Sequence, residues 1–406
     1  LPDRPDRAHL RAQARDLLRS GAAASLAAAQ FAIAKRYGFA SWPKLKAHVE
    51  SLSLAGQLKA AIDAEDLPRV LAMMTAHPEL HRAALGYGGN GPLTWVAECR
   101  VPGGKPSAAR LEMARWMIAH GSDVHQGGDG PLMRAALNDQ RIPMMELLVA
   151  HGADVNARWD GRYPIVCAPC ESLQAAALRW LLERGAKARS GYHGGALAMV
   201  VGTYARDVMG KHACLRVLAD AGVPMPDSPT LALHAGRIDL LEDHLRRDPA
   251  LLSRRFSQSE IFPTAIGMRP EDGLTATPVD GGTLLHLAIE MQDLASANWL
   301  IDRGADVDAR AAIDLDGFGG HTPLHQAVVS MGARDGESAR LLLAHSADPG
   351  QRATFRKQLK DVGDPDAERM REFRDVTSIG YARAYQVQRW VDQAAVGLIA
   401  ARTSGI

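Results

Sequence analysis

Hydrophobic positions along most of the chain recur at spacings of three and four, the pattern of helices that bury one face. Residues 130–161, GPLMRAALNDQRIPMMELLVAHGADVNARWDG, show it most clearly. Pro131 suits the first turn of a short helix, where a missing N–H costs nothing, and MMELL supplies the apolar stripe of a second helix. Gly152 favours the left-handed conformation that ends this helix, and DVNAR extends beyond it. Because such a pair cannot bury its apolar face alone, the pattern predicts neighbours of the same kind.

This stretch resembles one ankyrin repeat. The resemblance lies in G-P-L-M-x-A-A at 130–136, where the family has T-P-L-H-x-A-A, and in GADVNA at 152–157. TLLHLA at 283–288 and TPLHQA at 322–327 are closer matches to the same opening. Helix-ending turns recur at 121, 152, 185, 222, 304 and 346, and further helix pairs fill the gaps and both ends. The resemblance implies an all-α ankyrin-repeat solenoid of about nine repeats with β-hairpin fingers over residues 54–406.

Residues 1–53 precede the repeats and predict about three helices, RAHLRAQARDLLRS, SLAAAQFAIAKRY and SWPKLKAHVESL. We interpret this segment as a helical N-terminal cap that shields the apolar face of the first repeat. A DNA-binding helix-turn-helix is the alternative, because AIAKRYGFASWPKLKAHV has two short helices joined by a glycine-containing turn. Pro43 in the opening turn of the second helix and the lack of a wider basic field argue against it.

Three segments interrupt the repeat period, at residues 256–280, 308–321 and 353–376. All three fall at the finger end of their repeats, and the resemblance places fingers along the concave side of the stack. One hypothesis is that the insertions fold over this groove and close it into a pocket. The alternative is that they are solvated loops, which the mixed charge of RKQLKDVGDPDAERMREFRD fits equally well.

Composition narrows the classes of partner. The chain has 47 Lys and Arg against 46 Asp and Glu, so no global field attracts nucleic acid or an anionic membrane. Four scattered cysteines predict no disulfide framework, and no apolar run approaches the length of a membrane span. We expect a monomeric cytoplasmic protein without nucleic-acid or membrane partners. Because the chain begins at Leu1, a leader removed before it stays an open question.

The resemblance implies that the ends of each first helix and the fingers face the concave groove. This groove collects a large share of the few aromatic residues, which suit a protein segment, a flat small molecule or the face of a sugar. A protein partner is the leading interpretation, and a small-molecule or carbohydrate ligand stays open. The candidate ligand-binding residues are Trp95, Glu98, Arg134, Trp159, Asp160, Arg162, Tyr163, Tyr192, His193 and Tyr381.

The alternative function is hydrolysis of a carbohydrate in a groove closed by the insertions. Glycosidases need two carboxyl groups about 5 to 9.5 Å apart. Neighbouring repeats offer Glu171 with Asp160, and Glu290 with an acidic residue of the 308–321 segment. The candidate catalytic residues are Glu171, Glu290, Asp316 and His321. The other interpretation of these acids is that they cap helices or pair with arginines, and since the chain has no catalytic signature, the enzyme question stays open.

Several suggestive motifs have simpler explanations. His286 and His325 occupy the histidine of T-P-L-H, which in the resembled family hydrogen-bonds the neighbouring turn. Cys167 and Cys170 form one C-x-x-C without the second pair that a structural zinc site needs. DLDGF at 314–318 begins like a calcium loop but lacks its closing glutamate. We therefore expect neither a metal nor a cofactor.

Overall fold

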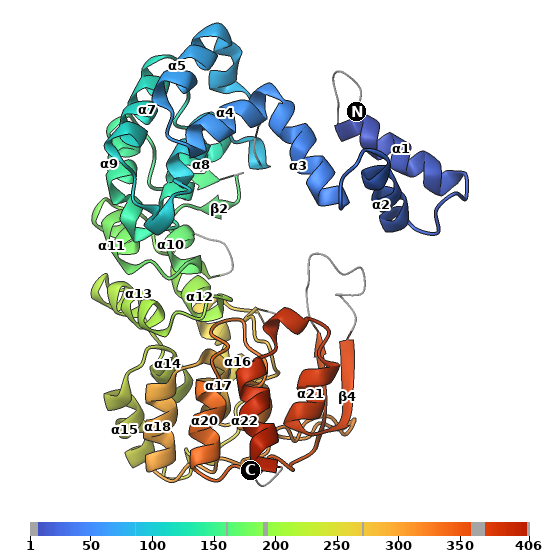
Figure 1. The fold of residues 1–406 in the computed structure, drawn as a ribbon. Coiled ribbons are helices and arrows are strands. Elements are labelled where there is room, and N and C mark those ends of the chain that lie inside the picture. The colour runs from blue at the N-terminus through green and yellow to red at the C-terminus, as the bar shows by residue number, and fades with distance from the viewer. Residues whose placement is uncertain are drawn as a thin grey trace. The chain divides into compact units, whose positions relative to one another are not determined.

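The structure is a computed structural model that describes residues 7–85, 87–159, 161–189, 194–269, 272–358 and 370–403. The chain divides into two compact units. Unit 1 comprises residues 1–135 and 140–161, and unit 2 comprises residues 136–139 and 162–406. Helices dominate both units (Figure 1). None of the helices in the described ranges is long and apolar enough to cross a membrane.

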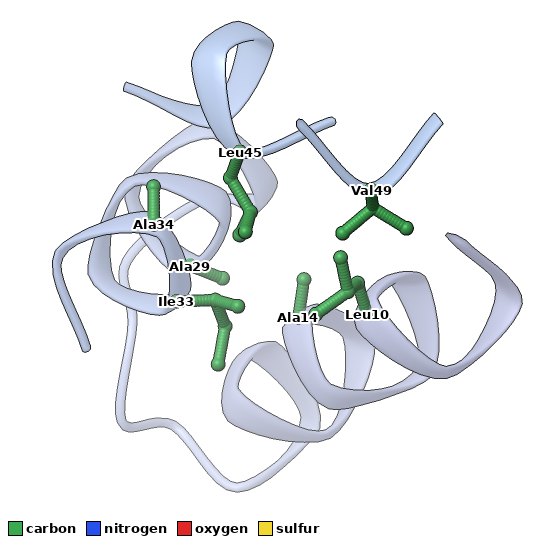
Figure 2. Packing of buried hydrophobic residues seen from close by; sticks show 7 residues of the cluster. All are labelled: Leu10, Ala14, Ala29, Ile33, Ala34, Leu45 and Val49. Atoms are coloured by element: carbon green, nitrogen blue, oxygen red, sulfur yellow. The ribbon is translucent and has the colours of Figure 1, made fainter. Parts of the chain in front are cut away.

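Unit 1 begins with the three helices predicted from the sequence. Ser25 caps the second by accepting a hydrogen bond from the N–H of Ala28 at 3.1 Å, and Gly38 follows it with a φ of 84°. The helices are α1 (Arg7–Arg19), α2 (Leu26–Arg36) and α3 (Trp42–Leu52). Figure 2 shows the side chains that they bury against one another: Leu10, Ala14, Ala29, Ile33, Ala34, Leu45 and Val49. The segment thus has a core of its own, and its role as a cap on the first repeat stays a prediction.

The rest of unit 1 consists of helix pairs joined by turns. Gly152 has a φ of 101° at the end of α9, which confirms the predicted left-handed helix end. The paired helices are α4 (Leu54–Asp63) and α5 (Leu67–Ala76), α6 (Pro92–Glu98) and α7 (Ala108–Ala119), and α8 (Gln126–Ala135) and α9 (Ile142–Ala150). Shorter elements along this stretch are η1 (Pro78–Arg82), η2 (Tyr87–Gly89), η3 (Pro102–Gly104), η4 (Asp139–Arg141) and the strand β1 (Arg158–Trp159).

Unit 2 continues the alternation of a short and a longer helix. After the strand β2 (Tyr163–Pro164), the pairs are α10 (Cys167–Glu171) and α11 (Ala175–Glu183), α12 (Gly195–Gly202) and α13 (Val208–Asp220), α14 (Pro229–His234) and α15 (Ile238–Arg247), α17 (Leu284–Met291) and α18 (Leu294–Asp302), α19 (Pro323–Ala327) and α20 (Glu337–Ala344), and α21 (Ser378–Ala384) and α22 (Gln393–Thr403). The 3-10 helix η6 (Gln388–Trp390) precedes α22.

Two buried histidines hold the best-matching helices in place. The Nδ1 atom of His286 accepts a hydrogen bond from the N–H of Thr283 at 3.1 Å, and its Nε2–H donates to the carbonyl of His321 at 3.1 Å. His325 repeats the arrangement with Thr322 at 3.2 Å and with the carbonyl of Val376 at 3.2 Å. Each imidazole therefore caps its own helix and ties it to the next turn, which confirms the structural role predicted for both.

The insertions of unit 2 are folded, and each buries some of its side chains. The first contains α16 (Gln258–Ile261) and η5 (Thr264–Ile266), and the third forms an antiparallel hairpin of β3 (Ala353–Gln358) and β4 (Met370–Val376). Phe355 and Phe373 face each other across this hairpin and are 1% and 4% exposed. The second insertion joins the third, because the N–H of Gly319 donates to the carbonyl of Thr354. The description as solvated loops is therefore wrong for the buried parts of these segments.

Candidate functional site

The predicted groove residues of unit 1 are charge-paired. Glu98, the last residue of α6, accepts hydrogen bonds from Arg100 at 2.9 and 3.0 Å and lies 3.9 Å from the guanidinium of Arg134. The Trp95 ring lies on the same helix, with the ammonium of Lys59 5.7 Å from its centroid. The structure thus brings three predicted residues, Trp95, Glu98 and Arg134, to one end of the helix pairs.

Trp159 has a packing role as well as a predicted binding role. A Cβ atom at Gly88 would lie only 2.7 Å from the Trp159 ring, so the indole lies directly against the Gly88 backbone. Gly88 has a φ of 65°, a conformation that favours glycine. Because Gly88 has no side chain, the Trp159 ring can lie against its backbone. Arg162 is exposed. Three further candidates, Asp160, Tyr192 and His193, lie outside the described residues.

In unit 2, Glu171 lies at the end of α10 between two tyrosines. The Tyr163 hydroxyl donates to its Oε2 atom at 2.7 Å, and the Tyr204 hydroxyl also hydrogen-bonds to it. The backbone carbonyl of Glu171 accepts from the Thr203 hydroxyl at 2.7 Å. Burial and the nearby Glu171 carboxylate raise the pKa of both tyrosines, so the two phenols stay protonated hydrogen-bond donors.

The first insertion crosses the end of α12 beside this glutamate. A Cβ atom at Gly202 would lie 2.7 Å from the methyl group of Met268, which shows how closely the insertion approaches the helix end. The N–H of Leu274 donates to the Gly202 carbonyl at 3.1 Å. Leu274 and Tyr204 remain 42% and 53% exposed. The insertion therefore adds an apolar side chain to the surface around Glu171.

Glu290 is enclosed by the same insertion and by Arg206. Its carboxylate accepts from the N–H of Ala276 at 2.6 Å and of Thr277 at 3.2 Å, and it lies 3.3 Å from the guanidinium of Arg206. Both side chains of this ion pair are 1% exposed. Burial raises the pKa of Glu290 and lowers that of Arg206. For each group, the loss of hydration therefore shifts the pKa more than the opposite charge of its partner does.

The ankyrin-repeat family model matches three stretches of the chain, residues 127–160, 280–312 and 319–353. These stretches contain the α8–α9, α17–α18 and α19–α20 pairs. The chain contains ankyrin repeats. A search of curated proteins finds no match to it. Ankyrin repeats in general mediate protein–protein interaction. The parts of each repeat that the sequence resemblance assigned to binding are the fingers and the ends of helix A, the first helix of each pair.

Several predicted site residues of this chain are not accessible. Glu290, His321 and Tyr381 are 4%, 2% and 0% exposed, so the expectation that they are accessible to a ligand in the groove is wrong. The physical reason is the insertions: Phe355 and Phe373 of the hairpin each pack edge-on against the Tyr381 ring at 4.8 Å. His321 donates through Nε2 to the carbonyl of Pro278 at 2.9 Å. The sequence located the insertions as breaks in the repeat period but did not indicate which residues they bury.

The acidic residues proposed to act with Glu290 bind a different cation. Asp314 and Asp316 lie 2.8 and 3.0 Å from the guanidinium of Arg356, on the exposed side of the second insertion. Glu290 is paired instead with the buried Arg206. No ion pair or hydrogen bond in the described part of the chain joins Glu290 to either aspartate.

The sequence did not indicate the buried Lys211 or the half-buried Lys357. Lys357 donates to the Thr275 hydroxyl at 3.0 Å, and burial lowers its pKa to about 8 despite the nearby Glu290. Lys211 donates to the Val201 carbonyl at 3.1 Å and lies 3.0 Å from Nδ1 of His234, and burial with the charge of Arg206 lowers its pKa to about 7. Nothing in the local sequence separates these lysines from exposed ones, because their burial depends on segments distant in the chain.

Metal chemistry finds no support among the described residues, where no three His, Cys, Asp or Glu side chains converge on one point. Cys167 and Cys170 are buried and form no disulfide with another described cysteine, and burial raises the pKa of Cys170 well above its ordinary value. Both behave as small apolar side chains in the packing of α10.

Proposed function

We propose that the chain is a binding module that holds an extended segment of a partner protein along its helix-A ends and fingers. The observation that carries the proposal is the surface around Glu171 in unit 2, where Tyr204, which binds the carboxylate, and Leu274, which is hydrogen-bonded to Gly202 two residues before Tyr204, remain exposed. Exposed apolar side chains next to polar groups are typical of protein-binding sites. The Leu274–Gly202 hydrogen bond holds the backbone under this surface, so little order is lost on binding.

We further propose that the helix pairs are nine consecutive repeats of an ankyrin solenoid, capped by residues 1–53. Three helix pairs in unit 1 and six in unit 2, nine among the described residues, support this count. A monomeric state, a cytoplasmic location and the lack of nucleic-acid partners are part of the same proposal, and they rest on the balanced charge and the scattered cysteines.

The hydrolase alternative has less support. Glu290 is enclosed with an arginine and two backbone N–H groups, and Glu171 receives two phenol hydroxyls, so among the described residues, which do not include Asp160, neither carboxylate has a second acid as its partner. A panel of chromogenic glycosides tests this alternative directly. Turnover that Glu171→Gln abolishes would favour the hydrolase over the binding module.

A random dodecapeptide library displayed on phage and selected on the immobilised full chain tests the binding proposal. We expect enriched peptides whose affinity falls at least about tenfold on the double variant Tyr204→Ala, Leu274→Ala, since each residue is an exposed apolar anchor. Ile313→Ala is the matched control, because Ile313 is 62% exposed in the second insertion of the same unit. Equal binding to wild type and double variant, or failure to enrich any peptide, would refute the proposed site.

A further inference from the structure

We infer that the partner segment presents an arginine or lysine side chain to Glu171, beside an apolar side chain that covers Tyr204 and Leu274. This inference rests on the proposed function and specifies the chemistry of the partner. It comes from a comparison of three glutamates that occupy similar positions at the ends of first helices, Glu98, Glu171 and Glu290.

The other two glutamates both have an arginine partner within the protein. Glu98 receives two hydrogen bonds from Arg100, and Glu290 is paired with Arg206 at 3.3 Å. Among the described residues, no lysine, arginine or histidine lies within 4.0 Å of the Glu171 carboxylate, whose side-chain partners are the hydroxyls of Tyr163 and Tyr204. Within the described part of the chain, Glu171 is therefore the one of the three whose carboxylate is held by neutral hydrogen-bond donors without a cation.

The carboxylate retains capacity for a cationic partner. Two carboxylate oxygens together offer about four acceptor positions, and two phenols fill about half of them. A guanidinium matches a carboxylate in shape and donates two parallel hydrogen bonds to it, while an ammonium donates as a point charge. Either cation placed on Glu171 also lies close to the faces or edges of the two tyrosines that hold the carboxylate, and aromatic faces attract cations.

The surroundings explain why an apolar side chain should accompany the cation. The backbone of Leu274 is held by two hydrogen bonds. Its N–H donates to the Gly202 carbonyl at 3.1 Å, and its carbonyl accepts from the Arg206 guanidinium at 2.6 Å. Its side chain and that of Tyr204 are thus presented by a fixed backbone. Arg206 itself cannot neutralise Glu171, since its guanidinium is committed to Glu290 and to backbone carbonyls.

The selection described above provides the test when it is repeated on the variant Glu171→Gln. The amide still accepts the Tyr163 hydrogen bond but carries no charge. On wild type we expect enrichment of arginine or lysine next to a large apolar residue, and we expect these peptides to bind Glu171→Gln about tenfold more weakly, as for loss of a hydrogen bond to a charged group. Affinity for wild type should fall as NaCl is raised, whereas affinity for Glu171→Gln should change little.

Glu183→Gln is the matched control, because it removes one exposed negative charge from α11 and should leave binding unchanged. Glu171→Lys extends the test, since it should select acidic peptides in place of basic ones. Equal melting temperatures for wild type and Glu171→Gln show that the site remains folded, and if they differ, the salt dependence of wild type alone decides. Enriched peptides that need Tyr204 and Leu274 but show no basic preference would overturn the inference and leave the proposed function standing. Failure to enrich any peptide would reject both.

Discussion

Gly152 illustrates how a single residue limits an element. Its φ of 101° is a conformation that a β-branched residue adopts only with strain, whereas the space around it is open, with His125 at 4.0 Å as the nearest side chain. We expect Gly152→Val to lower the free energy of unfolding by about 1 to 2 kcal/mol through backbone strain alone. Chemical denaturation of the two proteins measures the difference. Gly397→Ala is the control, because Gly397 lies inside α22 with open space around it and an alanine should stabilise that helix by up to about 1 kcal/mol. An unchanged midpoint for Gly152→Val would show that its φ carries no strain.

At the scale of elements, the buried pair Arg206–Glu290 joins the loop after α12 and the first insertion to the end of α17. We expect Glu290→Gln to lower the free energy of unfolding by about 3 to 5 kcal/mol, because it leaves the Arg206 charge buried without a counter-charge. The same substitution should cost less in an Arg206→Gln background, and a double-mutant cycle by denaturant unfolding measures this coupling. The exposed substitution Glu183→Gln should change stability by less than about 0.5 kcal/mol. Additive effects of the two buried substitutions would contradict an interaction between these groups.

At the scale of the whole molecule, we expect the free energy of unfolding to rise with pH, because several histidines and lysines have lowered pKa values in the folded chain. Burial lowers the pKa of His286 and of His325 to about 4, so the unfolded chain binds more protons below about pH 6.5, and the stabilisation is lost as pH falls toward 4. Each histidine should account for about 2 kcal/mol between pH 6.5 and 5. Lys211 and Lys357, with pKa values of about 7 and 8 against 10.5 in the unfolded chain, act in the same direction from about pH 7 and pH 8, respectively, up to 10.5.

Denaturant midpoints at pH 5, 6.5 and 8 measure this rise. Glu290 opposes it at the acid end because burial raises its pKa, and buried thiols oppose it above about pH 8.5 for the same reason. Lys211→Met should flatten the part of the curve between pH 7 and 8. A maximum of stability at pH 6 or below would show that the buried bases do not dominate.

The N-terminal segment supplies the second prediction at this scale. If residues 1–53 cap the first repeat, deletion of residues 1–52 should expose the apolar face of α4 and lower the melting temperature with increased aggregation. Ser53 is retained because it caps α4 by accepting a hydrogen bond from the N–H of Gly56 at 3.0 Å. Light scattering and thermal melts compare the two chains. An equally stable and soluble truncated chain would identify the three helices, which have their own core, as an independent module. Tight, salt-sensitive DNA binding by the full chain would reject the cap in favour of a helix-turn-helix.

The sequence alone determined the features that depend on near neighbours in the chain. The three N-terminal helices, the helix end at Gly152 and the capping roles of His286 and His325 follow from periodicity, glycine conformation and the T-P-L-H spacing, because each involves residues within a few positions of one another. The tertiary structure decided which polar groups are buried.

Arg206 meets Glu290 across 84 positions, and Tyr381 meets Thr277 across 104. No local sequence pattern predicts contacts between residues so far apart in the chain. The sequence shows where an insertion lies in the chain but not which surface it covers. The candidate site changed for the same reason: the predicted glutamates Glu171 and Glu290 look alike in sequence, and only the folded insertions leave the first near solvent between two tyrosines and enclose the second with an arginine.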